Sequence, residues 1–308
     1  MNYDPLTMNS KTILLTGGTG VIGKKLAEQL LAQGYTVSML SRKPGNDPRI
    51  KTFLWDVNKG QIDASCIDGV DTVVHLAGAG IADSRWTERR KKEIINSRVK
   101  SIESIYGLLG AQNHQVKSIV SASAIGYYSD RGDELQTEDS PPNTDFMGRC
   151  CLEWEQAVDE GEKLGLRILK FRTGVVLNEE GALKLMAQPV RLYVGSPLGN
   201  GRQWIPWIHW QDVVDMYMLG IEDGTFSGVY NMVAPNPVTN AQLTKAIAKQ
   251  LHKPLWAPKV PAFLLKLLMG EMSTIVLGST KVSAQKIEDA GYKFKYPEVA
   301  SALKQIYG

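Results

Sequence analysis

The stretch Lys11-Thr-Ile-Leu-Leu-Thr-Gly-Gly-Thr-Gly-Val-Ile-Gly23 decides the fold of this 308-residue chain. It opens with an apolar run, Ile-Leu-Leu, which is typical of a short buried strand. It continues as TGGTGVIG at 16–23, after which Ile22, Leu26 and Leu30 fall on one face of a helix. The glycines therefore lie on a strand-to-helix turn, which is the context that a dinucleotide-binding loop requires.

Each glycine of such a loop has its own physical reason. One permits the tight turn, one lets the backbone approach a pyrophosphate, and one lets the helix pack closely on the strand. The start of the helix adds free N–H groups and partial positive charge for the phosphates. A plain glycine-rich turn is the alternative interpretation. We expect a dinucleotide to bind at Gly17, Gly18, Thr19, Gly20, Val21, Ile22 and Gly23.

The residues after the next apolar run, 35–40, indicate which dinucleotide binds. An acidic residue at this place holds the free ribose hydroxyl of NAD, whereas an arginine suits the 2′-phosphate of NADP. Here the strand is followed by Ser41, Arg42 and Lys43, and the first acid is Asp47. The chemistry favours NADP(H) over NAD(H). Alternatively, Arg42 and Lys43 are ordinary exposed loop charges.

Apolar and amphipathic segments alternate through most of the chain. We expect further strands at 53–57, 70–78, 118–123, 166–176 and 228–233, with helices at 88–109 and 151–164. This alternation predicts an α/β fold with a doubly wound parallel Rossmann sheet. The rhythm breaks after Leu177. We expect residues 1–177 with 206–234 to form the dinucleotide-binding domain. Residues 178–205 with 235–308 are expected to form a smaller, mostly helical substrate or cap domain.

In an open α/β sheet the ligand lies at the carboxyl ends of the strands. The residues that end or follow the predicted strands are therefore further candidates for cofactor binding. They are Asp56, Val57, Leu76, Ala77, Gly78, Ser121, Arg172, Thr173, Gly174 and Val175.

Bulk composition excludes several classes of function. A net charge of +3 gives no field for nucleic acid, and no apolar run reaches membrane length. We therefore expect no nucleic-acid partner and no membrane, and a monomer or homodimer. Three cysteines form no disulfide framework and, with the four histidines, no metal-ligand spacing. Because that spacing is absent, we expect no metal. Residues 1–10 lack the pattern of a signal peptide, so we expect a cytoplasmic protein.

Several segments together resemble the extended short-chain dehydrogenase/reductase superfamily. They are TGGTGVIG at 16–23, HLAG at 75–78, SASAIGYY at 121–128, FRTGVVL at 171–177, IHWQDVV at 208–214 and VYNMVAPNPVT at 229–239. NSRV at 96–99, CLEWE at 151–155 and the tail at 269–297 resemble a narrower group. It is the epimerase family protein subgroup of the NAD-dependent epimerase/dehydratase family, whose C-terminal domain has no assigned function. The resemblance implies an NADP-binding oxidoreductase or epimerase-like enzyme acting on an unidentified small substrate.

The chain departs from the superfamily at the catalytic pair. Active members carry a tyrosine as acid or base and a lysine four residues later, which lowers the pKa of that tyrosine. The comparable residues here are Phe146 and Cys150, with Arg149 one position out of register. Phenylalanine at this position also fits the narrower subgroup. The usual proton relay therefore cannot operate.

Three hydroxyl side chains remain as candidate catalytic groups. Ser123 ends the predicted strand where the resemblance places a polarising hydroxyl, and it would donate a hydrogen bond to a developing oxyanion. Tyr127 or Tyr128 would replace the missing tyrosine as the acid. Alternatively, Ser123 packs against the sheet and the tyrosines are walls of the pocket.

Aromatic residues suggest where a substrate binds. Trp204, Trp207 and Trp210 surround His209 in the region that lines the superfamily's substrate pocket, and they suit an apolar or aromatic ligand. His209 would donate to the substrate, or it is a structural histidine. Arg85 and Trp86 would form an anion-binding lid, unless they are ordinary loop residues.

Three functions stay open at this point. The first is an NADP-dependent enzyme, favoured by Ser123, the adjacent tyrosines and the tryptophans. The second is a non-catalytic NADPH-binding sensor or regulatory protein, favoured by the loss of the tyrosine–lysine pair. A scaffold without a cofactor comes third, because the intact glycine loop argues against it.

Overall fold

The computed structural model describes residues 11–308, so the expectation about a signal peptide lies outside the described residues. Its centre is an eight-stranded sheet in the order β12-β8-β6-β5-β1-β2-β3-β4, parallel except where β4 pairs with β3. The strands are β1 (Thr12–Thr16), β2 (Thr36–Ser41), β3 (Lys51–Asp56), β4 (Gln61–Ile62), β5 (Thr72–His75), β6 (Ser118–Ala124), β8 (Arg167–Thr173) and β12 (Gly228–Met232). The predicted doubly wound Rossmann sheet is confirmed.

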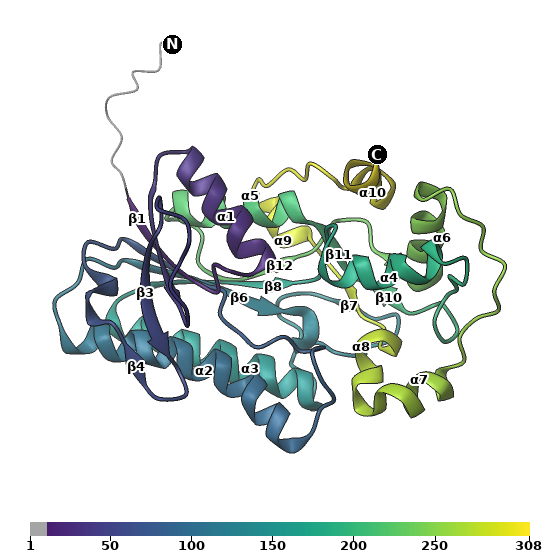
Figure 1. Cartoon of the computed structure of the whole chain (residues 1–308), viewed down its shortest axis with the longest axis horizontal. Coiled ribbons are helices and arrows are strands. Elements are labelled where there is room, and N and C mark those ends of the chain that lie inside the picture. The colour runs from purple at the N-terminus through teal and green to yellow at the C-terminus, as the bar shows by residue number, and fades with distance from the viewer. Residues whose placement is uncertain (1–10) are drawn as a thin grey trace, which may run out of the picture.

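Helices cover both faces of this sheet (Figure 1). On one face α1 (Val21–Ala32) packs against α5 (Trp210–Glu222), and on the other α2 (Glu88–Ala111) packs against α3 (Phe146–Asp159). The apolar residues of β1 alternate between the two cores, with Ile13 and Leu15 facing α1 and Leu14 facing α2. Burial on both faces explains why the central strands read as continuous apolar runs.

Two predicted elements have different bounds. Helix α3 begins at Phe146 rather than at residue 151, because the side chain of Asp145 accepts from Gly148 N–H and starts the helix earlier. The strand predicted at 166–176 is divided into β8 and β9 (Val175–Leu177) at Gly174. There a Cβ would lie 2.6 Å from the carbonyl oxygen of Pro206, so only glycine allows the two segments to approach.

Most of the remaining segments lie beyond the carboxyl edge of the sheet, whereas α9 (Gln285–Asp289) packs on β12 (Figure 1). A third core joins those segments that contain Leu183, Ile205, Trp207, Leu243 and Leu303. The elements are β7 (Leu135–Gln136), α4 (Gly181–Arg191), β10 (Trp204–Ile205), β11 (Trp207–His209), β13 (Val238–Thr239), α6 (Asn240–Gln250), α7 (Ala262–Met269), α8 (Thr274–Leu277), β14 (Lys281–Val282), α9 (Gln285–Asp289) and α10 (Val299–Tyr307).

The C-terminal residues also return to the main core. Val282, Ala284 and Ile287 are buried in the cluster that contains Phe171 and Tyr217. The proposed division into a dinucleotide domain and a cap domain stays a prediction. Within residues 11–308, no helix is both long enough and apolar enough to cross a lipid bilayer.

Candidate functional site

The glycine loop between β1 and α1 contains two kinds of glycine. Gly17 has φ +68°, and a Cβ there would lie 2.5 Å from the carbonyl oxygen of Leu76. At Gly23 a Cβ would lie 2.6 Å from the Cα of Gly18. Gly20 is different: its φ of −73° suits any residue, and its Cβ would meet only the carbonyl oxygen of Gly17, at 3.2 Å. The fold needs the first two glycines, whereas at Gly20 the absent side chain keeps space open above the loop.

That open space is continuous with a cleft at the carboxyl edge of the sheet. Gly20 caps α1 without a side-chain hydrogen bond, which leaves the N–H groups of the first turn available to an anion. The cleft measures about 310 Å³ and has more apolar than polar lining. It is lined by Gly17, Gly20, Val21, Ile22, Gly23, Leu76, Ala122, Ser123, Thr173, Val213 and Tyr217. Free N–H groups, bare glycine and apolar walls fit the pyrophosphate and nicotinamide of a dinucleotide.

The predicted phosphate-selecting residues follow β2. Ser41 is half-buried and its Oγ accepts from the N–H of Lys43, while Arg42 and Lys43 are exposed. Asp47, the first acid after the strand, is already engaged: it accepts two hydrogen bonds from the side chain of Arg49, which also pairs with Glu28. Arg42 and Lys43 are in no ion pair within residues 11–308, so a ligand can recruit either charge without breaking one.

Ser123 is joined to a buried ion pair. Its Oγ lies 2.6 Å from Glu155 Oε1, to which it donates, and Arg172 holds both carboxylate oxygens of Glu155 at 2.8 and 2.9 Å. All three residues are buried. Although burial works against a charge, the hydrogen bonds and charge of Glu155 raise the pKa of Arg172 above its usual range. The carboxylate is thus held as a charged hydrogen-bond acceptor.

This contact reverses the predicted role of Ser123. A hydroxyl has one proton, and here that proton is directed to Glu155. In this arrangement the Ser123 proton does not face an oxyanion, so the expected donation stays a prediction for the state in which Glu155 itself carries a proton. Because Ser123 also lines the cleft, its oxygen lone pairs are available there. Ser123 can accept a hydrogen bond from a hydroxyl or amide of a ligand.

The two tyrosines differ in access. Tyr128 is fully buried, its hydroxyl donates to Asn231 Oδ1 at 2.7 Å and accepts from Arg172, and burial raises its pKa to about 12. Because its hydroxyl is buried and already engaged, these contacts argue against the predicted role of Tyr128 as an acid. Tyr127 is half-buried, with Arg172 3.5 Å above its ring, and burial also raises its pKa. Phe146 is buried against Trp86, so it has neither a proton nor access.

The tryptophans do not converge on one pocket, so the predicted aromatic substrate site is wrong in this respect. Trp207 is fully buried and its Nε1 donates to Asn236 O, while Trp204 Nε1 donates to Asp133. His209 is also fully buried: its Nδ1 accepts from Gln211 N–H, so its Nε2 carries the proton and faces Gln305 Oε1 at 2.8 Å. His209 is the cap of α5, a structural role.

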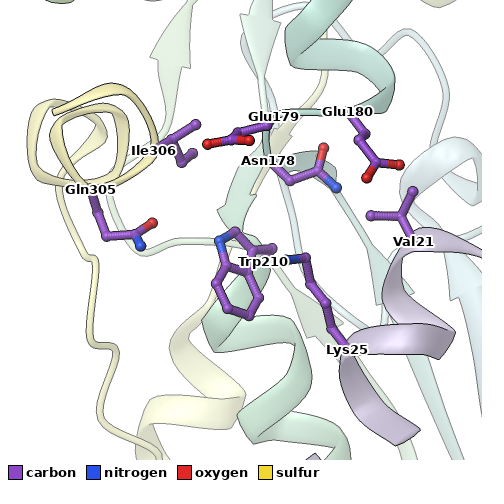
Figure 2. A pocket seen from close by; sticks show the side chains of 8 residues that line it. All are labelled: Val21, Lys25, Asn178, Glu179, Glu180, Trp210, Gln305 and Ile306. Atoms are coloured by element: carbon purple, nitrogen blue, oxygen red, sulfur yellow. The ribbon is translucent and has the colours of Figure 1, made fainter. Parts of the chain in front are cut away.

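Trp210 lines a second pocket of about 200 Å³, which Val21 and Lys25 of α1 also line (Figure 2). Lys25 lies 3.8 Å above the Trp210 ring. Figure 2 shows that the remaining side chains come from the loop before α4 and from α10. They are Asn178, Glu179, Glu180, Gln305 and Ile306, with Val21 at the edge that it shares with the cleft.

The other predicted residues fall into three groups. Leu76 and Thr173 line the cleft, whereas Arg172 is turned into the buried ion pair and Ser121 contacts His75 inside the sheet. Arg85 donates to Leu268 O, and Trp86 donates to Ile81 O, so both hold loops together. The remaining positions lie at the ends of β3, β5 and β8: Asp56, Val57, Ala77, Gly78, Gly174 and Val175.

Sequence reasoning missed Glu155, Asn231, Val213 and Tyr217. One signal was available for Glu155. It lies on the face of α3 that buries Cys151, Trp154 and Val158, and a carboxylate on an apolar face needs a buried partner. Val213 and Tyr217 looked like ordinary core residues of α5. Within residues 11–308, no group of three or more His, Cys, Asp and Glu side chains has the geometry to hold a metal.

Comparison with known proteins identifies relatives of the whole chain. Residues 13–232 match the NAD-dependent epimerase/dehydratase family, and residues 260–306 match a domain of unknown function (DUF1731). The epimerase family protein YfhF of Bacillus subtilis is 35% identical, over 96% of this chain and 97% of that protein. The crystal structure of human epimerase family protein SDR39U1 with NADPH superposes with a TM-score of 0.85. It is 31% identical and covers 96% of this chain and 99% of that chain.

A nucleoside-diphosphate sugar epimerase of Corynebacterium glutamicum is also similar, at 32% identity and a TM-score of 0.79, over 97% of this chain and 58% of that chain. The fold, the glycine loop and these matches lead to the same assignment. The chain belongs to the NAD-dependent epimerase/dehydratase family.

Proposed function

We propose that this protein is an NADP(H)-dependent oxidoreductase or epimerase-like enzyme that interconverts an alcohol and a carbonyl on a small substrate. One observation carries the proposal: Ser123, in the wall of the cleft, donates at 2.6 Å to the charged carboxylate of Glu155. The human relative solved with NADPH supports the choice of cofactor, and so does the free Arg42 after β2.

Different residues of this chain bind the cofactor and transfer the proton. The glycine loop and the first turn of α1 hold the pyrophosphate, and Arg42 holds the 2′-phosphate. When bound, the nicotinamide supplies or accepts the hydride. Ser123 Oγ accepts the proton of the substrate hydroxyl as its own proton passes to Glu155 Oε1, and the reverse movement returns that proton to a carbonyl oxygen. Arg172 keeps Glu155 charged between turnovers.

A panel of aldehydes, ketones and their alcohols tests this function, with loss or gain of the reduced-nicotinamide absorbance as the readout. For a compound that turns over, we expect Ser123→Ala to lower kcat by roughly tenfold to ten-thousandfold, the range for a proton-transferring group. Ser104→Ala is the matched control, because Ser104 is half-buried on α2, away from the cleft, and bonds only to its own helix. A parental rate in Ser123→Ala would place the chemistry elsewhere.

A second function is favoured by a different observation. Phe146 has no proton to give and the Tyr128 hydroxyl is enclosed by Arg172 and Asn231. A protein that binds NADPH without turning it over needs no such acid. If the protein binds NADPH and no compound of the panel reacts, the sensor or regulatory function replaces the enzyme.

A further inference from the structure

Helix α7 carries its apolar residues on the outside. Phe263 and Leu267 are 71% and 74% exposed, and Leu268 is 59% exposed. With Leu264 they occupy neighbouring positions on one helical face, whereas Ala262, Leu265 and Met269 face the protein and are half-buried. No residue of α7 is buried. This arrangement is the reverse of that in a surface helix of a globular protein, which turns its polar face to the solvent.

Contacts on its inner side hold α7 in this orientation. Arg85 Nη2 donates to the carbonyl oxygen of Leu268 at 2.7 Å, and Lys91 pairs with Glu271 at 2.6 Å just after the helix. Figure 1 shows α7 at the lower edge of the molecule, away from the central sheet. The apolar face is therefore presented outward by a docked helix. We name the exposed side chains Phe263, Leu264, Leu267 and Leu268 the α7 face.

The stretch of chain that contains the α7 face is positively charged. Residues 252–270 contain Lys253, Lys259 and Lys266 and no acidic residue. Trp256, in the same stretch, is 68% exposed. The next acid along the chain, Glu271, pairs with Lys91, which also pairs with Glu88. Exposed Phe and Leu on α7, with exposed Trp256 and three lysines in the same stretch 252–270, combine apolar insertion with positive charge, the two features by which a peripheral segment binds a membrane interface.

We propose that the α7 face binds peripherally to an anionic lipid surface, with Phe263 and Leu267 entering the headgroup boundary and the lysines contacting the lipid charges. The whole-chain charge of +3 led to the expectation of no membrane contact, because it averages this basic stretch with a remainder that is neutral overall. A helix of eight residues gives only weak, reversible binding.

The same features argue against a second copy of the chain as the occupant. A twofold dimer would bring equivalent lysines near one another across the interface, and no acid of residues 252–270 would offset them. The α7 face with Trp256 offers five partly exposed side chains. A stable dimer of standard size takes roughly 20–30 residues from each partner, which this face does not supply.

Flotation of the full-length protein with lipid vesicles tests the proposal. We expect binding to vesicles of phosphatidylcholine mixed with phosphatidylglycerol, and at least about tenfold weaker binding to phosphatidylcholine alone. The variant Phe263→Ser/Leu267→Ser should lose about tenfold or more in partitioning, and Lys259→Glu/Lys266→Glu a similar factor that disappears at high salt. Leu54→Ser/Leu164→Ser is the matched control, because it removes two exposed leucines elsewhere.

Each other outcome counts against the proposal. Absence of binding to the anionic vesicles overturns it, and so does binding that neither variant weakens. Equal binding to both kinds of vesicle excludes an anionic surface. A dimer that dissociates in Phe263→Ser/Leu267→Ser, measured by analytical ultracentrifugation, would identify a second copy as the occupant instead. Circular dichroism establishes that both variants are folded, which is expected because they change only exposed side chains.

Discussion

At the scale of single residues, the proposed preference for NADP(H) rests on Arg42. Its guanidinium is exposed after β2, while Asp47 is engaged by Arg49. A charge-assisted contact to the 2′-phosphate contributes about 1.5–3 kcal/mol. Arg42→Ala should therefore weaken NADPH binding by about tenfold to a hundredfold and leave NADH binding nearly unchanged. Fluorescence titration with both nucleotides measures this, and Lys245→Ala, which removes an exposed charge of α6, is the control. Equal losses for both nucleotides would contradict the role of Arg42.

Glu155 connects the candidate chemistry with stability. Replacing it with glutamine keeps the shape but leaves the Arg172 charge buried without its counter-ion. Breaking a buried pair in this way typically costs about 3–5 kcal/mol. We expect a loss of this size in the free energy of unfolding of Glu155→Gln, measured by urea denaturation. Glu153→Gln, an exposed change on the same helix, should change it little. Indistinguishable values for the two variants would show that the pair is not a structural unit.

His209 makes stability depend on pH. Burial lowers its pKa to about 4, whereas an unfolded chain has a histidine pKa of about 6.5. Between these values the unfolded state binds more protons, so stability is fully present above about pH 6.5 and falls as the pH drops toward 4. This group contributes about 3 kcal/mol at neutral pH, at about 1.4 kcal/mol per pKa unit.

Denaturation at a series of pH values tests this contribution. His75, which burial holds at a pKa of about 3, adds to the same trend, so part of the slope persists without His209. His209→Asn keeps a side-chain acceptor at the cap of α5 and removes the titrating ring. Its stability should therefore fall less than that of the parent between pH 6.5 and 4. Parallel curves for the two proteins would exclude the assignment.

Among the elements, the start of α5 holds the C-terminal segment. Asp212 is fully buried there, and its carboxylate accepts from the Tyr292 hydroxyl and from the N–H groups of Lys295 and Tyr296. Asp212→Ala would leave these donors unpaired, so we expect a loss of roughly 2–4 kcal/mol in stability. Asp223→Ala, at the exposed end of the same helix, is the control. Equal effects of the two changes, in thermal denaturation, would contradict the tie.

Local signals in the sequence were sufficient for the elements of the sheet. Burial on both faces leaves an apolar run, as in β1 and β5, and the capping box at Thr239 is a local signal for the start of α6. The start of α3 was missed because its cap, Asp145, precedes residues without a clear apolar period. The break between β8 and β9 was missed because it depends on Pro206, which is distant in sequence.

The site was predictable only where chemistry follows from a contiguous motif. The glycine loop is such a motif, and the structure shows why Gly17 and Gly20 are needed for different reasons. The direction of the Ser123 hydrogen bond depends on Glu155, which lies 32 residues away on another element. Trp204 and Trp207 are close in sequence but donate to different partners, because Trp204 lies in β10 and Trp207 lies in β11.

At the scale of the whole molecule, the glycine loop, the end of β6 and helix α5 meet at one edge of the sheet. The glycine loop of α1 and the end of β6 form the cleft, and α5 closes its wall with Val213 and Tyr217. The C-terminal segment is tied to α5 through Asp212 and to the loop after β5 through Arg85. Because these contacts connect distant segments of the chain to the elements that form the cleft, binding of a cofactor is best measured on the intact protein.

Titration of the intact protein and of Gly20→Val with NADPH and NADH tests the central claim most directly. At Gly20 the backbone suits any residue and a Cβ meets little protein, so the variant should fold while its side chain occupies the phosphate space. Gly224→Val, at an exposed glycine whose Cβ would meet nothing, is the control. We predict that the parent and the control bind one NADPH, at least about tenfold more tightly than NADH, and that folded Gly20→Val binds neither. Unchanged NADPH affinity in folded Gly20→Val would contradict the assignment of this loop.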